Sequence, residues 1–253
     1  FPAEALPADL ESRLSLALGG TVRVERVAVP DLEWAEVWKA RFAPRRIGNR
    51  LWVRPSWDRA PVPEPYRVPL ELDPGMAFGT GHHETTLLCL EWLDANIHPE
   101  QPVDVLDCGC GSGLLAIAAL KLGADRAAGL DNDPLALEAT RSNADDNEVG
   151  DRLEVGAHLG ELSHAGPFDV VLANILANTL VELADDLIAA TRVGGDLILS
   201  GILAHQTQQV RSAFEPAIHW RVTTTLGDCA GRSVTTIEAL AGDPYNPVIR
   251  AWI

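Results

Sequence analysis

The residues from 104 to 117 constrain the fold of this chain more than any other stretch. Their sequence, DVLDCGCGSGLLAI, is a short apolar run, then glycines at alternate positions, then a second apolar run. The first run predicts a buried strand, and residues 114–122 predict a helix covered on most faces because they are almost wholly apolar. Glycine permits positive φ and lets the backbone approach a ligand closely. We therefore expect a ligand at the loop formed by Gly109, Gly111 and Gly113.

An acidic residue in the next expected strand extends this pattern. Residues 126–131 predict a strand that ends at Asp131, which lies 22 residues after Gly109. In a strand–helix–strand unit, an acid at this place accepts hydrogen bonds from both hydroxyls of a ribose. The dinucleotide-binding pattern needs a third glycine where this chain has Leu114. Glycines at three alternate positions after Asp107 resemble instead the S-adenosylmethionine methyltransferases, which implies S-adenosylmethionine as the cofactor.

The alternation of strand and helix patterns predicts an α/β fold with a mainly parallel sheet and helices on both faces. Ligands of such sheets bind outside the carboxyl ends of the strands. Asp107, Asp131 and Asn174 all lie at such ends, so we expect them to meet at one site. The parallel strands are expected at 103–106, 126–131, 152–155, 169–174 and 196–201, with a closing antiparallel pair at 220–226 and 233–240.

The chain before this domain divides into two parts. Residues 1–58 predict a small, incomplete α+β module with a helical pattern at 6–18, a strand at 21–29, a helix at 32–42 and a strand at 51–53. Residues 59–74 hold five prolines, a density typical of a stiff linker. We predict that the catalytic domain spans residues 75–253.

The composition limits the partners of the protein. Its formal net charge of −16 disfavours direct binding of nucleic acid and favours a basic protein as substrate. No run reaches the length of a membrane span, and the chain opens without a signal-peptide pattern. The four cysteines form no disulfide framework, which suits a reducing compartment. We therefore expect a cytoplasmic monomer.

A metal site is not expected. Cys108 and Cys110 lack the second ligand pair that a zinc site requires. His82 and His83 are adjacent, so their side chains usually point apart, and no third ligand lies at useful spacing. Small residues in a tight turn explain the two cysteines better.

Four segments together resemble the bacterial ribosomal protein methyltransferase family PrmA. They are LDPGMAFGTGHHETT at 72–86, the glycine loop with its helix, GLDNDP at 129–134 and ANIL at 173–176. The resemblance implies a class I, Rossmann-like methyltransferase domain behind a small substrate-recognition domain. It also implies trimethylation of lysine side chains and of an N-terminal amine on protein eleven of the large ribosomal subunit.

The resemblance also implies the residues that contact the cofactor. Positions matching Thr86, Gly109, Asp131 and Asn174 hold S-adenosylmethionine in the family. The loop before the helix at 85–96 is rich in glycine, and we expect it to close over the ligand. The predicted cofactor contacts are Phe78, Thr80, Thr86, Asp107, Gly109, Gly111, Gly113, Asp131 and Asn174.

The predicted chemistry is an in-line transfer of a methyl group to an amine. A lysine amine, with an ordinary pKa of about 10.4, must first lose a proton. The side-chain oxygen of Asn174 and the carbonyl of Ile175 are predicted to accept N–H bonds and so aim the nitrogen lone pair at the methyl group. No general base is predicted, because bulk water at an open site serves as well as His82 or His83.

Other functions stay open from the sequence. The first alternative is a class I methyltransferase that acts on another protein amine or on a small molecule. A nucleic-acid enzyme is less favoured because an adenine-amine methyltransferase has Asn-Pro-Pro-Tyr where this chain has Asn-Ile-Leu-Ala at 174–177. A binding module without turnover is disfavoured by the intact Asp131 and Asn174.

Overall fold

The structure is a computed structural model that describes residues 9–24, 43–65, 68–72, 83–215, 218–227 and 233–241, the last two ranges as backbone. The chain forms two compact units, residues 1–41 and residues 42–253. Each unit is described by itself below.

The smaller unit contains helix α1, Leu10–Leu18, inside the stretch predicted as helical. The helix ends at Gly19, which adopts a left-handed conformation with φ of 67°. Ser15 Oγ then accepts a hydrogen bond from Val22 N at 2.8 Å. Residues 21–24 are described without strand structure, and the remainder of the predicted strand and the predicted helix at 32–42 lie outside the described residues.

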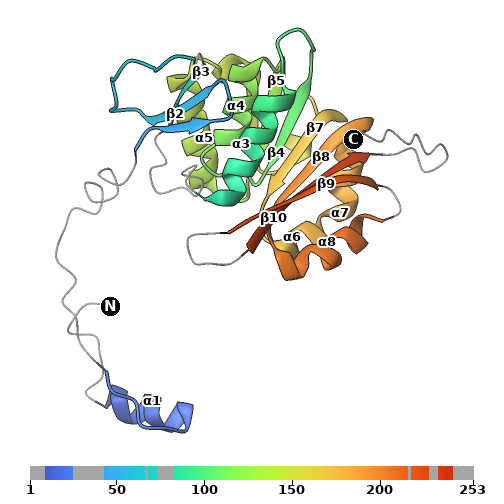
Figure 1. Cartoon of the computed structure of the whole chain (residues 1–253). Coiled ribbons are helices and arrows are strands. Elements are labelled where there is room, and N and C mark those ends of the chain that lie inside the picture. Colours follow the sequence, from blue (N-terminus) through green and yellow to red (C-terminus); the bar gives the residue numbers. More distant parts are fainter. Residues whose placement is uncertain are drawn as a thin grey trace. The chain divides into compact units, whose positions relative to one another are not determined.

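The larger unit is built on a seven-stranded sheet with the order β6-β5-β4-β7-β8-β10-β9 (Figure 1). The first five strands are parallel, and β10 pairs antiparallel with both β8 and β9. This confirms the predicted sheet with its closing antiparallel pair. The strands are β4 Asp104–Cys108, β5 Arg126–Leu130, β6 Leu153–Gly156, β7 Phe168–Asn174, β8 Thr191–Leu203, β9 Ile218–Gly227 and β10 Ser233–Ala241.

Two groups of helices cover the two faces of this sheet (Figure 1). The helices on one face are α3 Glu84–Asn96, α4 Leu114–Leu122 and α5 Pro134–Asp146. Those on the other face are α6 Ala177–Glu182, α7 Ala184–Ala190 and α8 Thr207–Phe214. Short 3-10 helices span Gly150–Arg152, Leu159–Glu161 and Ala204–Gln206.

The central strands are apolar because both of their faces are covered. Val171, Leu172 and Ala173 of β7 are completely buried, as are Leu197 and Leu199 of β8. Helix α4 is buried at every position except Lys121, as its composition predicted. The carboxyl ends of the parallel strands are therefore held by a continuous core.

A second, three-stranded sheet belongs to the larger unit. β2, Leu51–Pro55, pairs antiparallel with β1, Arg45–Ile47, and parallel with β3, Val68–Leu72. β3 lies inside the stretch predicted as a linker. The division between the compact units falls at residue 41, before the predicted boundary at residue 58, so β1 and β2 group with the catalytic unit. A substrate-recognition role for residues 1–58 stays a prediction.

Side chains of the helical layer attach this small sheet to the helices. The carboxylate of Asp94 on α3 accepts hydrogen bonds from Asn49 N at 2.7 Å and Arg50 N at 3.1 Å. The amide of Asn147, after α5, accepts from Glu71 N at 2.9 Å and donates to Glu71 O at 2.6 Å. Because Glu71 lies in β3, this pairing holds the strand that leads into the glycine-rich loop.

Two negative findings concern only the described residues. Within them, no helix is both long enough and apolar enough to cross a membrane. In the same part of the chain, no three histidine, cysteine or acidic side chains are placed so that they could hold a metal ion.

Candidate active site

The parallel register brings the predicted residues to one edge of the sheet. Asp107 of β4 lies opposite Gly129 of β5 and Leu172 of β7. Asp131 directly follows β5, and Asn174 is the last residue of β7. The three polar residues predicted from their places at strand ends therefore share the carboxyl edge. Phe78 and Thr80 lie outside the described residues, so their place at this edge stays a prediction.

The glycine loop after β4 is folded against the end of β5. Gly109 N and Cys110 N both donate to Leu130 O, at 2.7 and 2.9 Å. Gly109, Gly111 and Gly113 have φ values of 77°, 55° and 78°, a region that side-chain-bearing residues rarely adopt. The requirement for glycine at all three positions is therefore conformational, and at Gly109 and Gly113 an added Cβ would also collide with the side chains of Ile175 and Thr140.

Asp131 is held in place by two backbone groups. Its Oδ2 accepts from Gly111 N at 2.9 Å, and its Oδ1 accepts from Asp133 N at 3.0 Å. An ionised carboxylate has about four acceptor positions, so each oxygen retains one for a further donor. The side chain is half-buried. This geometry fits a ligand with two neighbouring hydroxyl groups.

Asp107 carries an unsatisfied acceptor inside the loop. Its side chain is only 1% exposed, and Oδ2 accepts from Ala116 N at 3.2 Å. Among the residues that the structure describes, Oδ1 is buried without any hydrogen-bond partner. Burial, aided by the charge of Asp131 and opposed by the Ala116 N–H, raises the pKa of Asp107 to about 7. A buried carboxyl oxygen without a partner offers a place for a polar group of a ligand, such as an amine or amide.

The two cysteines of the loop are neutral thiols. Burial, with the nearby charge of Asp107, raises the pKa of Cys108 to about 11 and that of Cys110 to about 12. Cys110 Sγ lies 3.4 Å from Thr140 Oγ1, which in turn donates to Gly111 O at 3.0 Å. These contacts fit the predicted structural role of the cysteines in a tight turn.

Asn174 is connected to the first turn of α3. Its Nδ2 donates to Thr86 Oγ1 at 3.0 Å, so two predicted site residues that are 88 positions apart are in direct contact. This bond orients the amide and leaves its Oδ1 for another donor. His83 caps α3, with Nδ1 accepting from Thr85 N at 3.3 Å, while His82 lies outside the described residues.

Ile175 lies against both the glycine loop and β8. A Cβ added to Gly109 would lie 2.2 Å from Ile175 Cγ2, so the isoleucine side chain packs directly on the loop. A Cβ added to Gly201 would lie 2.3 Å from Ile175 O. The backbone carbonyl predicted to orient the acceptor amine is therefore positioned beside a glycine of β8.

The sequence patterns did not single out Ser200 and Gly201. Ser200 Oγ donates to Thr85 O at 3.1 Å and so attaches α3 to β8 next to Thr86. Gly201 has a φ of 83° and provides the space for Ile175. Ser200 and Gly201 interrupt the apolar run at 197–202, and this interruption could have drawn attention to them. Their roles could not be predicted from it, because their partners come from other segments of the chain.

Comparison with known proteins decides the family. Residues 4–229 match the sequence profile described as Ribosomal protein L11 methyltransferase (PrmA). The Azotobacter vinelandii protein with the name ribosomal protein L11 methyltransferase is 49% identical over 227 residues, 88% of this chain and 75% of its own. The chain belongs to the ribosomal protein L11 methyltransferase family. This confirms the predicted family, and with it the methyltransferase class and S-adenosylmethionine as the cofactor.

A second sequence relative and a solved structure point to the same family. A ribosomal protein L11 methyltransferase from Cupriavidus necator is 50% identical over 189 residues, which cover 75% of this chain and 60% of that protein. The solved structure of a ribosomal protein L11 methylase from Lactobacillus delbrueckii subsp. bulgaricus has a TM-score of 0.69 and 28% identity, covering 80% of this chain and all of that one. These matches confirm the class I methyltransferase fold.

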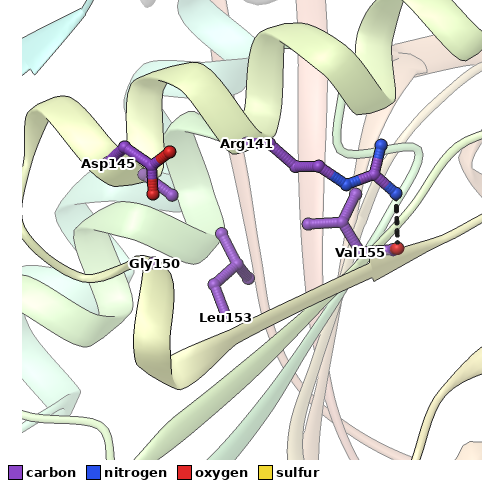
Figure 2. Close-up of a pocket in the computed structure, with 6 residues that line it drawn as sticks. Arg141, Asp145, Gly150, Leu153 and Val155 are labelled. Atoms are coloured by element: carbon purple, nitrogen blue, oxygen red, sulfur yellow. Dashed lines mark hydrogen bonds between the residues drawn. The ribbon is translucent and has the colours of Figure 1, made fainter.

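A surface hollow lies beside the edge strand β6, away from these residues. It has a volume of about 240 Å³ and is lined by Arg141, Ala144, Asp145, Gly150, Leu153 and Val155. Figure 2 shows Arg141 reaching from α5 to β6, where its Nη2 donates to Val155 O at 2.9 Å. The lining includes none of the predicted site residues, and the arginine fastens a helix to an edge strand. We assign the hollow to packing of α5 on β6.

The raised pKa of Asp107 makes ligand-free stability depend on pH. The folded protein keeps this proton up to about pH 7, whereas the unfolded chain loses it near 3.8. Between these values the unfolded state binds fewer protons, so the free energy of unfolding falls as pH rises, by up to about 4 kcal/mol. In Asp107→Asn this titration is absent. Urea unfolding should therefore show the variant gaining stability relative to the parent between about pH 4 and pH 7. A difference that is constant with pH would contradict the raised pKa.

Gly201→Ala should displace the Ile175 carbonyl. The new methyl group would meet Ile175 O at 2.3 Å, so the backbone of one strand must move. Gly194→Ala is a matched control, because Gly194 lies on the same strand with φ of 81° and has open space around it. Both variants carry the left-handed strain of about 1–2 kcal/mol. We expect methyl transfer to fall at least about tenfold in Gly201→Ala only, because small misplacement of orienting groups is costly. Equal kcat in the two variants would contradict this.

Proposed function

We propose that this protein transfers methyl groups from S-adenosylmethionine to amines of ribosomal protein L11. The observation that carries the proposal is the contact between Asn174 and Thr86 at the carboxyl edge, beside the glycine loop. It supplies an oriented amide acceptor next to a loop suited to a nucleoside, in a chain of the ribosomal protein L11 methyltransferase family.

The residues present fit the cofactor. Asp131 offers two free acceptor positions to ribose hydroxyls, and the buried Oδ1 of Asp107 lacks a donor. Gly109, Gly111 and Gly113 form the proposed cradle, Thr86 contacts Asn174 from α3, and Phe78 and Thr80 remain proposed contacts from the preceding loop. When bound, S-adenosylmethionine supplies a methyl group on a positively charged sulfur, which is already activated for displacement.

The acceptor amine is oriented by two oxygens in this proposal. Asn174 Oδ1 and the carbonyl of Ile175 accept its N–H bonds and direct its lone pair toward the cofactor side of the site. A lysine amine gives up a proton to solvent before transfer, since its ordinary pKa is about 10.4. We propose trimethylation of lysine side chains and of the N-terminal amine.

The proposed partner is a basic protein. The net charge of −16 attracts a cationic surface and repels phosphates, so we propose that L11 is recognised without direct contact to nucleic acid. We further propose that residues 1–58 take part in docking L11, and that the enzyme acts as a cytoplasmic monomer.

Intact mass spectrometry of recombinant L11 tests this function. With S-adenosylmethionine present, L11 should gain mass in steps of one methyl group, and peptide mapping should place the gains on lysine and N-terminal amines. L11 that gains no mass, while calorimetry shows cofactor binding, would support the second candidate, methylation of another protein amine or a small molecule. Transfer to RNA with none to L11 would overturn the proposal.

A further inference from the structure

Leu176 is an exposed apolar residue at the edge of the proposed site. Its side chain is 75% exposed, although it directly follows Asn174 and Ile175. Two nearby residues on either side of it, Ala173 and Ala177, are buried at 0% and 2% exposure. A leucine in this position does not contribute the folding free energy that burial of its side chain in the core would provide.

The backbone that carries Leu176 is fixed. Leu176 is the N-cap of α6, with φ of −62° and ψ of 141°, and its carbonyl accepts from Leu180 N at 3.0 Å. The preceding residue, Ile175, is packed between Gly109 and Gly201. Exposure of Leu176 is therefore a property of a rigid segment. Helix α6 does not need this side chain for packing, because Ala177 and Leu180 provide its buried face.

We propose that Leu176 is a substrate-contact residue that packs on the aliphatic stem of the acceptor lysine while Asn174 orients the amine. This rests on the proposed function. Two residues of extended chain span about 7 Å, so Leu176 lies within reach of the four methylene groups behind an amine held at Asn174. Lysine commonly packs this stem along an apolar surface while its charged end stays in a polar environment.

The charges of this part of the chain favour such an occupant. Residues 153–191 contain no lysine and no arginine. Glu182, Asp185 and Asp186, on the helices that begin after Leu176, are exposed. A cationic side chain that approaches Leu176 therefore meets no lysine or arginine from this segment, and three acids follow Leu176 within ten residues of the chain.

The assignment predicts a loss that is specific to lysine acceptors. An N-terminal α-amine has no aliphatic stem, so it would not use Leu176. In Leu176→Ala, the rate at lysines of L11 below saturation should fall about tenfold, the lower end of the cost of losing an apolar contact in a pocket. The kcat at saturating L11, the Kd for S-adenosylmethionine, and the rate at any α-amine that reacts should stay within about twofold of the parent.

Two further variants sharpen the test. Leu176→Met keeps a long apolar side chain and should restore the lysine rate. Val193→Ala removes a side chain that is 66% exposed near the start of β8, at the opposite edge of the sheet, and should change nothing. An unchanged lysine rate in Leu176→Ala, or an equal loss at lysine and α-amine, would overturn the assignment alone. A parent enzyme that methylates no amine of L11 would overturn the proposed function as well.

Discussion

Asn174→Ala is expected to lower kcat for methyl transfer about a hundredfold, the usual cost of removing one preorganised group from a reacting centre. The structure places Asn174 at the end of β7 with its amide fixed by Thr86. Removal of the side chain deletes the amide oxygen proposed to orient the acceptor, while the glycine loop and Asp131 stay intact. The Kd for S-adenosylmethionine should therefore change only a few-fold. Single-turnover rates and calorimetry on the same preparation would measure both quantities.

A neighbouring asparagine provides the control for this prediction. Asn178, four residues later, lies in the first turn of α6 and is exposed, so Asn178→Ala should leave both kcat and Kd unchanged. A parallel loss of kcat and cofactor affinity in Asn174→Ala would assign Asn174 to cofactor binding instead. Turnover at the parent rate would remove it from the site.

Asp131→Ala should weaken S-adenosylmethionine binding at least about a hundredfold. Two hydrogen bonds from ribose hydroxyls to a carboxylate contribute about 1.5–3 kcal/mol each, and the substitution removes both acceptors. It also removes the acceptor for Gly111 N, which holds the glycine loop in its present conformation. The fold should survive because the side chain is half-buried and lies outside the core. Isothermal calorimetry would give the Kd, and circular dichroism would confirm the fold.

Asp133→Ala is the matched control. Asp133 is also acidic and lies two residues later, but its Oδ1 accepts from Leu135 N and caps α5. Loss of this cap should cost about 1 kcal/mol of stability and leave cofactor affinity nearly unchanged. If both variants bind S-adenosylmethionine like the parent, Asp131 does not hold the ribose.

Several elements were predictable because local composition determines them. The buried run of β4, the apolar helix α4 and the strand β5 that ends before Asp131 each follow from a short pattern. Their boundaries were less predictable. Between β7 and β8 the chain forms two helices, α6 and α7, that meet at Leu183, and β8 extends well beyond the predicted 196–201. Helix breaks and strand ends depend on neighbours that a local pattern does not contain.

The small sheet was the least predictable part of the fold. Its third strand, β3, includes Pro69 and lies in a stretch whose proline content predicted a linker. The strand forms because β2 pairs with it and because Asn147, 76 positions after Glu71, hydrogen-bonds its backbone. Such long-range partners override local propensity.

Short motifs in the sequence were enough to predict the glycine loop, the acid at the end of the second parallel strand, the asparagine at the end of β7 and the family, because each motif consists of residues close together in the chain. The folded structure was needed to show that Thr86 contacts Asn174, that Gly201 makes room for the Ile175 carbonyl, that Asp107 is buried with an unsatisfied oxygen, and that Leu176 is exposed. These properties arise where α3, β4, β7 and β8 meet. Burial, electrostatic environment and close contact are set by whichever segments the fold brings together, and sequence spacing does not specify them.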